Sequence, residues 1–347
     1  MLNAQALRSV FIVSVEDCDC SLRRDSISEA VPKEAVGILC VGYLRGMARK
    51  KLIVGLGEVL WDLLPERKSL GGAPANFAYI ASLLGDEGIV ASRVGRDQKG
   101  TEARTWLERL GLRTDCLQTD ENHATGTAKV EVDPAGQARY DIPQPTAWDF
   151  LDWTAQWQDL AATADAVCFG SLAQRSAKSR ATITAFLRAM PEGAVRVFDV
   201  NLRQSFWTRE IILESLQQAD IVKLNDEEMP AIKALSNISE DDDWVSLCRL
   251  VERWNLKLVC VTRGSRGSLL VSKTDSNEHL GFRVKVADTI GAGDAFTAAL
   301  VHEYVSGSSL GLMNEMANLV GAWVATEVGA TPRPKDGAIE RSLAEIG

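Results

Sequence analysis

From Lys51 onward, short runs of β-branched residues alternate with helix-length segments whose apolar residues recur every three or four positions. This alternation is typical of strand-helix units, in which helices cover a largely parallel sheet. The sequence therefore predicts an α/β fold. The predicted strands are 52–57, 89–94, 166–170, 195–200, 221–224, 258–262 and 268–272, and the clearest predicted helices are 74–84, 102–110, 179–190 and 244–254.

Two segments interrupt this rhythm. Residues 127–142 read as two alternating strands joined by a turn at 133–136, whose Pro and Gly suit a hairpin reversal. Residues 62–72 are polar and rich in turn formers. We expect lid segments at about 62–72 and 126–143 to build a small β lid over the strand ends, where α/β proteins bind ligands.

Charge and cysteine content limit the partners and the compartment. The 347 residues carry a formal net charge of −9 without a long basic run, so neither nucleic acid nor a membrane surface is an expected partner. The apolar run 9–15 is too short to span a membrane, and the seven cysteines form no CxxC pair, so we expect a cytoplasmic protein with reduced thiols. Residues 1–48 are predicted to be a poorly ordered extension without a catalytic part, followed by one domain at 49–340.

The sharpest motif is 288–296, DTIGAGDAF, which leads into an apolar helical segment. Gly291, Ala292 and Gly293 would turn the backbone closely at a helix start, where N–H groups and the helix dipole create an anion hole. Asp294 would then lie in the first turn, where its carboxylate could accept a proton from an attacking hydroxyl. The alternative is that Asp294 only caps a helix and the glycines only make a turn.

The string D-T-x-G-A-G-D resembles the signature of the ribokinase-like (PfkB) carbohydrate kinases. The similarity covers about 51–335, and no Walker sequence is present. The resemblance implies a three-layer α/β/α sandwich with a mainly parallel central sheet, and transfer of a phosphoryl group from ATP to a sugar.

The resemblance also implies a sugar pocket. The segment 71–76, GGAPAN, is similar to the family's N-terminal signature, in which Gly71, Gly72 and Asn76 would line the pocket. Asp62 matches the aspartate that holds sugar hydroxyls, because a carboxylate can accept two hydrogen bonds at once. The alternative for Asp62 is an acid at a loop tip facing water.

On the nucleotide side, Asn225 and Glu228 look like the NxxE motif that helps to hold magnesium through its waters, although Asn and acids are also common at helix starts. The segment that contains Thr262, Gly264 and Gly267 is similar to the family's phosphate loop. Asn318 falls where these kinases contact adenine. The expected cofactors are ATP, Mg²⁺ and K⁺.

A monovalent-cation site is implied next to the anion hole. The resemblance assigns to it the Asp288 side chain and the carbonyls of Ile290, Ala325 and Gly329. Ligation by oxygen alone suits potassium rather than zinc.

Segments 57–62, 170–175 and 198–203 look most like bacterial fructokinases, so the expected reaction is fructose to fructose 6-phosphate. Arg203 would lie near the transferred phosphate, or else form a salt bridge at a helix start. Ribose, 2-keto-3-deoxygluconate or a nucleoside remain alternative acceptors, and a non-catalytic sugar sensor is the alternative of another class. Relatives often dimerise through the lid, and Trp148, Trp153 and Trp157 would cover such an interface or fill a core.

Overall fold

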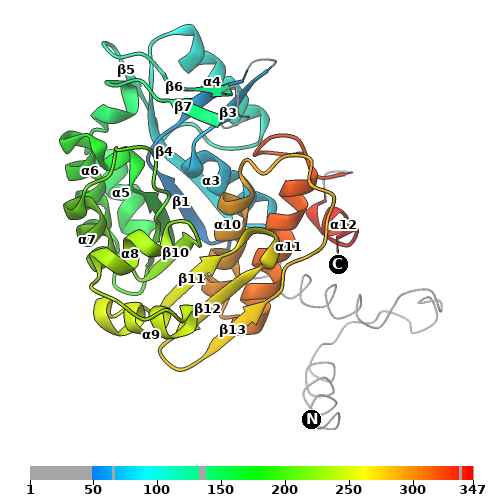
Figure 1. Cartoon of the computed structure of the whole chain (residues 1–347). Helices are drawn as coiled ribbons and strands as arrows, with labels where there is room; N and C mark the ends of the chain where they lie inside the picture. The colour runs from blue at the N-terminus through cyan, green and yellow to red at the C-terminus, as the bar shows by residue number, and fades with distance from the viewer. Residues whose placement is uncertain (1–48, 65–66, 133–137, 336–337, 347) are drawn as a thin grey trace, which may run out of the picture. The chain divides into compact units, whose positions relative to one another are not determined.

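The computed structural model describes residues 49–64, 67–132, 138–335 and 338–346. Lys50–Gly347 form one compact unit around a nine-stranded sheet with the order β13-β12-β11-β10-β9-β8-β1-β4-β5 (Figure 1). All neighbouring pairs are parallel except β11–β12 and β12–β13. The strands are β1 Leu52–Leu56, β4 Glu87–Gly95, β5 Leu117–Asp120, β8 Ala166–Gly170, β9 Val195–Asp199, β10 Ile221–Asn225, β11 Leu258–Thr262, β12 Ser268–Ser272 and β13 Ser276–His279.

Helices cover both faces of this sheet, which confirms the predicted three-layer α/β/α fold. Neighbouring residues of β1 face opposite sides: Ile53 packs in one hydrophobic cluster and Val54 in the other. Strands that are buried on both faces appear as continuous apolar runs, and this is why the sequence located them well. One face carries α3 Ala73–Leu83, α4 Gln98–Arg109, α10 Ala292–Val305, α11 Leu310–Thr326 and α12 Ile339–Leu343; the other carries α5 Ala155–Thr163, α6 Ala177–Ala189, α7 Arg209–Gln218, α8 Met229–Leu235 and α9 Asp243–Trp254.

Helix α4 begins one turn before the start that apolar periodicity predicts. Asp97 caps the helix by accepting a hydrogen bond from the Gly100 N–H at 2.7 Å, and the same carboxylate accepts from the N–H of Thr125 at 2.8 Å. Its polar first turn contributes no apolar signal, so a cap rather than periodicity sets the boundary.

A second, four-stranded sheet has the order β3-β2-β6-β7. Its strands are β2 Leu60–Leu63, β3 Lys68–Gly71, β6 Gly126–Val132 and β7 Ala138–Asp141. Most of the turn-rich stretch 62–72 is paired as the β2–β3 hairpin, and β2 also pairs in parallel with β6. Both proposed lid segments thus belong to one small sheet, whereas the predicted turn at 133–136 lies outside the described residues.

Polar and aromatic contacts anchor this small sheet to the central unit. Trp61 of β2 is buried, and its indole N–H donates to the Lys99 carbonyl of α4 at 3.0 Å. At the base of β7, Asp149 caps the turn that begins at Thr146 and pairs with Arg175 at 2.8 Å. The Trp61 hydrogen bond therefore ties strand β2 to helix α4.

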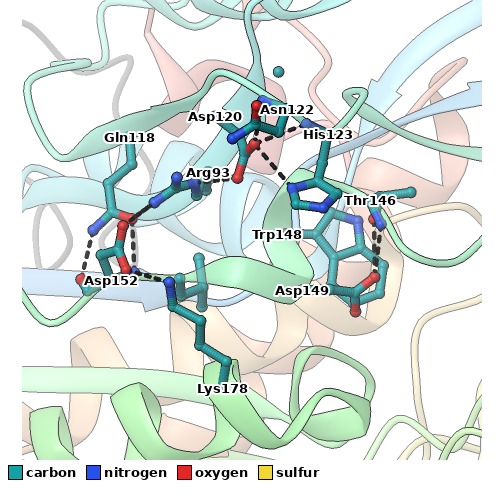
Figure 2. Close-up of polar contacts among 12 residues, drawn as sticks. Arg93, Gln118, Asp120, Asn122, His123, Thr146, Trp148, Asp149, Asp152 and Lys178 are labelled. Atoms are coloured by element: carbon teal, nitrogen blue, oxygen red, sulfur yellow. Dashed lines mark hydrogen bonds and ion pairs between the residues drawn. The ribbon is translucent and has the colours of Figure 1, made fainter.

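Figure 2 shows a neighbouring network at the edge of the central sheet. Arg93 of β4 donates to Asp120 of β5 at 2.8 Å and pairs with Asp152, which also pairs with Lys178 of α6 at 2.6 Å. His123 contacts Asp120 at 3.0 Å, so its ring belongs to the same network.

Two tryptophans and two cysteines that the sequence singled out lie in the core. Trp148 and Trp157 are fully buried, and Trp153 packs against the same cluster, so the core alternative is confirmed over an interface. Cys168 and Cys260 are buried free thiols, as predicted from their apolar strands.

Candidate active site

The candidate site lies at the carboxyl ends of the parallel strands. Strand β1 lies between β4 and β8, and the chain adds later strands on opposite sides of it. Such a point, where the strand order reverses, leaves a crevice in which α/β proteins bind ligands. Glu58 follows β1 there and is buried, and Asp62 lies slightly farther along on β2.

Glycines bring two backbones close to these carboxylates. A Cβ atom on Gly71 would lie 2.2 Å from an Asp62 carboxylate oxygen, and one on Gly72 would lie 2.4 Å from the Glu58 carbonyl oxygen. Gly72 also has a φ of 105°, which a residue with a side chain rarely adopts. Any side chain at either position would displace Asp62 or the turn after β1.

Helix α10 begins at the DTIGAGD motif, as predicted. Gly291 is its N-cap with a φ of 80°, and a Cβ there would lie 2.4 Å from the Ala330 Cβ. Asp294 stands in the first turn and accepts a hydrogen bond from the Asn76 side chain of α3 at 2.8 Å. Tertiary packing thus brings Asn76 and Asp294 together across 218 residues of sequence.

Three carboxyl groups with raised pKa values share this crevice. Burial raises the pKa of Glu58 to about 7 and that of Asp62 to about 6, and the Asp294 charge adds to both shifts. Burial and then the Asp199 carboxylate raise the pKa of Asp294, although the Asn76 hydrogen bond and the charges of Lys223 and Arg203 oppose them. Such clustering of perturbed acids is characteristic of functional sites.

Arg203 supplies an exposed positive charge to the same crevice. Its field lowers the pKa of Glu58, Asp62 and Asp294 against the effect of burial. The ion pairs found among the described residues do not include Arg203. The loop carries positive φ angles at Asn201 and Gln204, 41° and 48°, in a region that residues with side chains visit rarely.

Lys223 is a neighbour of the anion hole to which the sequence assigned no role. Its ammonium lies 3.1 and 3.2 Å from the two carboxylate oxygens of Asp199, and 3.2 Å from a Cβ placed on Gly293. Burial by itself lowers the pKa of Lys223, but Asp199, Glu228 and Asp294 outweigh it and the pKa lies above its usual range. The sequence did contain a signal for this pair, because Asp199 and Lys223 are charged residues inside two predicted apolar strands. Buried charges need partners, so the two could have been expected to pair.

The Asn225–Glu228 motif forms a closed turn. Asn225 Oδ1 accepts from the Glu228 N–H at 2.8 Å, and Glu228 Oε2 accepts from the Asn225 N–H at 2.9 Å. Glu228 Oε1 accepts from the N–H of Leu202 at 2.8 Å, so this buried carboxylate joins the turn to the Arg203 loop. Each oxygen keeps a lone pair, and Glu228 can therefore still accept from water.

The predicted phosphate loop follows β11. Gly264 and Gly267 have φ angles of 57° and 78°, and a Cβ on Gly267 would lie 1.9 Å from the His279 carbonyl oxygen. Thr262, at the end of the strand, bonds the Leu224 carbonyl at 3.4 Å. Asn318 of α11 is buried and donates to the Ser268 hydroxyl at 2.7 Å, which fixes the start of β12 against the helix.

Asp288 binds three donors in the loop before α10. Its Oδ1 accepts from the Ile290 N–H at 3.0 Å, and its Oδ2 accepts from the Gly329 N–H at 3.1 Å and from the Arg67 guanidinium. The Ala325 carbonyl accepts the N–H groups of Ala287 and Asp288 at 2.9 and 3.3 Å. The four predicted cation-site residues are therefore close together, as a network that Arg67 also joins.

Comparison with known proteins agrees with this geometry. The model of the pfkB family carbohydrate kinase matches residues 55–336. Fructokinase from Escherichia coli is 30% identical over 303 residues, which cover 79% of this chain and 93% of that protein. An uncharacterized sugar kinase from Pyrococcus horikoshii, solved with ATP, is 27% identical with a TM-score of 0.71 and covers 85% of this chain and 99% of its own. Fructokinase from Vibrio cholerae O395, solved with fructose, ADP and a calcium ion, is 25% identical with a TM-score of 0.70 and covers 86% of this chain and 98% of its own.

The fold, the α10 motif and the family match define a sugar kinase. The chain belongs to the pfkB family of carbohydrate kinases. It is an ATP-dependent enzyme that phosphorylates a carbohydrate. Within the described part of the chain, no helix has the length and apolarity required to cross a membrane.

Proposed function

We propose that this kinase transfers the γ-phosphoryl group of ATP to the 6-hydroxyl of fructose, with Asp294 as the general base. The observation that carries the proposal is the half-buried Asp294 carboxylate in the first turn of α10, within 2.8 Å of Asn76 and in electrostatic contact with Asp62 and Arg203. Acceptor activation and stabilisation of developing charge then converge on one helix start.

Each group has a separate task in this mechanism. Asp62 and Asn76 bind sugar hydroxyls, with Gly71 leaving room for the Asp62 carboxylate and Gly72 for the turn after β1. Asp294 takes the acceptor proton, and the N–H groups of Gly291, Ala292 and Gly293 stabilise the charge on the transferred phosphate. Arg203 is free to contact the equatorial oxygens of that phosphate. The small sheet excludes water from the site, which limits hydrolysis of ATP.

ATP would extend from this helix start toward Thr262, Gly264, Gly267 and Asn318. Magnesium bound with the nucleotide would neutralise phosphate charge, and Asn225 and Glu228 would orient its water ligands through the lone pairs that their turn leaves available. The described residues contain no group of three His, Cys, Asp or Glu side chains able to hold a metal.

Fructose is the favoured acceptor because two relatives, from Escherichia coli and Vibrio cholerae, are named fructokinase. The match to this chain covers most of each of them. The segments around Asp62, Arg175 and Arg203 motivated the same choice from sequence. Specificity between sugars depends on a few hydrogen bonds, so ribose, 2-keto-3-deoxygluconate and nucleosides remain the competitors that the experiment must include. A cytoplasmic location and a dimer through the small sheet belong to the same proposal.

The deciding experiment is coupled ADP release with magnesium across fructose, ribose, 2-keto-3-deoxygluconate and adenosine. We expect rapid turnover with fructose alone, and fructose 6-phosphate as the product by mass and NMR spectra. Turnover on another acceptor would retain the kinase mechanism and reject fructose. Sugar binding without turnover on any acceptor would support a sensor instead.

A further inference from the structure

The β2–β3 hairpin is joined to the loop before α10 by one ion pair. Arg67, just before β3, pairs with Asp288, and the two residues lie 221 positions apart in sequence. The Arg67 side chain is 34% exposed and that of Asp288 is 12% exposed, so the carboxylate is mostly buried and the arginine reaches it from the surface. The hairpin also carries Asp62, and Asp288 lies three residues before the helix cap Gly291.

The Asp288 loop does not fit a bound monovalent cation while this pair exists. Both carboxylate oxygens accept hydrogen bonds from backbone N–H groups, and Oδ2 also accepts from Arg67. The Ala325 carbonyl is likewise used by two N–H groups. A cation bound to Asp288 would therefore meet the guanidinium charge at the same oxygen, and like charges at contact distance repel strongly in a partly buried site.

The position of Arg67 is fixed by the hairpin. The N–H of Leu64 donates to the Arg67 carbonyl at 2.9 Å, which closes the turn, and Lys68 is paired with Leu63 in register. Asp62 follows in the same register, opposite Ser69. A displacement of Arg67 would therefore also displace Asp62, because both residues belong to the same paired hairpin.

We propose that Arg67 takes the place of a monovalent cation: its guanidinium neutralises Asp288, holds the loop before the anion hole and ties that loop to the hairpin that carries Asp62. The enzyme accordingly needs no potassium or other monovalent cation. Arg67 is a positioning residue, because it acts through Asp288 and the loop rather than on the reacting atoms. The catalytic part of this inference rests on the proposed role of the α10 start in phosphate binding, whereas the cation part does not.

The first test is thermal unfolding without substrates, in potassium chloride and in tetramethylammonium chloride at equal concentration. Wild type is expected to melt at the same temperature in both salts. Arg67→Ala exposes the Asp288 oxygens, and potassium is expected to raise its melting temperature by about 2–4 °C over tetramethylammonium, since binding to the folded state alone stabilises it. Arg67→Gln serves as a second variant that preserves most of the side-chain volume.

Two controls isolate the charge at this position. Lys68→Ala removes the adjacent cation of the same hairpin, which pairs with exposed Glu102, and should show no difference between the salts. Asp288→Asn added to Arg67→Ala should abolish the response of that variant to potassium. A potassium-dependent melting temperature in the wild type, or no potassium response in either Arg67 variant, would overturn the inference.

The second test measures ADP release in the two salts. We expect wild-type KM and kcat to be independent of potassium, and Arg67→Ala to lose activity by about 5–150-fold in tetramethylammonium, the usual range for coupled sites, with recovery in potassium. If wild type phosphorylates no acceptor, the proposed function fails, but the unfolding experiment still decides the cation inference. Equal activity of Arg67→Ala and wild type in tetramethylammonium would reject the positioning role.

Discussion

Two ion pairs of opposite character flank the Gly291–Gly293 turn. Lys223 and Asp199 lie opposite each other on neighbouring strands β10 and β9, with side chains 8% and 5% exposed. Arg67 and Asp288 come from a surface hairpin and a loop, with side chains 34% and 12% exposed. Both pairs adjust charge next to the same helix start, but one is part of the core and the other lies near water.

The difference in burial determines what each pair can do. Breaking a buried pair leaves a charge in the core, which costs several kcal/mol, so Lys223–Asp199 is a permanent feature of the fold. A pair whose arginine is partly exposed contributes less free energy, because water and salt screen that partner. The Arg67–Asp288 pair can therefore affect the loop without determining whether the domain folds.

The largest expected effect on stability is that of Lys223→Met, which tests whether the buried pair is structural. It leaves Asp199 buried without its cation, and we expect a loss of roughly 3–5 kcal/mol in the free energy of unfolding, measured in urea. The control is Lys285→Met at an exposed lysine, where the change should be small. Adding Asp199→Leu should recover much of the loss; Thr297, which bonds Asp199, retains the Gly293 carbonyl as its partner. An unchanged free energy in Lys223→Met would show that the buried pair is not structural.

Asp294→Asn tests the proposed chemical step without changing a residue of either ion pair. The amide can still accept the hydrogen bond from Asn76, but it is a far weaker base. We expect turnover to fall by about 100-fold or more, with sugar affinity nearly unchanged. Steady-state ADP release and calorimetric sugar binding measure the two quantities, and Asp159→Asn on α5 is a matched exposed control. Normal turnover in Asp294→Asn would reject its role as base.

Glu58 extends the comparison, because it is a buried acid that forms no ion pair with any other described residue. Its pKa of about 7 lies above the usual 4.5, so between these pH values the folded protein retains a proton that the unfolded chain has lost. Wild-type stability should therefore fall as the pH rises through this window. Glu58→Gln remains neutral, and from pH 5 to pH 8 it should gain on the order of 2 kcal/mol relative to wild type. Urea unfolding at both pH values measures this, and parallel pH profiles would contradict the shift.

Arg67→Ala should have the smallest effect on stability. In tetramethylammonium we expect the free energy of unfolding to fall by less than about 1 kcal/mol, and high salt should reduce the difference further because the arginine is partly exposed. Urea unfolding at low and high ionic strength measures this. A loss as large as that of Lys223→Met would remove the distinction between the two pairs.

Much of the fold follows from local sequence patterns. Strands buried on both faces give uninterrupted apolar runs, and β8, β11 and β12 have the predicted bounds. The lid strands β2 and β3 were not predicted as strands, because polar residues and short length hide their pairing. Strand β2 pairs with β6, which is remote in sequence, and this tertiary pairing stabilises the hairpin.

The candidate site also has parts that the local sequence predicted and parts that only the structure shows. Glycines at a helix start followed by an acid give a local signal, so the sequence placed Asp294 correctly in the first turn of α10. The roles of Arg203, Asn225 and Asn318 stay predictions. The structure adds that Asn225 and Glu228 bond each other and that Asn318 is buried against Ser268.

By itself, the sequence determined the α/β class, the main strands and helices and the Asp294 turn, because each depends on residues within one or two turns of chain. Only the tertiary structure decided that Lys223 faces Asp199, that Glu58 is buried and that Arg67 reaches Asp288. These contacts depend on strand register, on how deeply a group is covered and on an encounter across 221 residues. None of these quantities has a local periodicity that a sequence pattern could reveal.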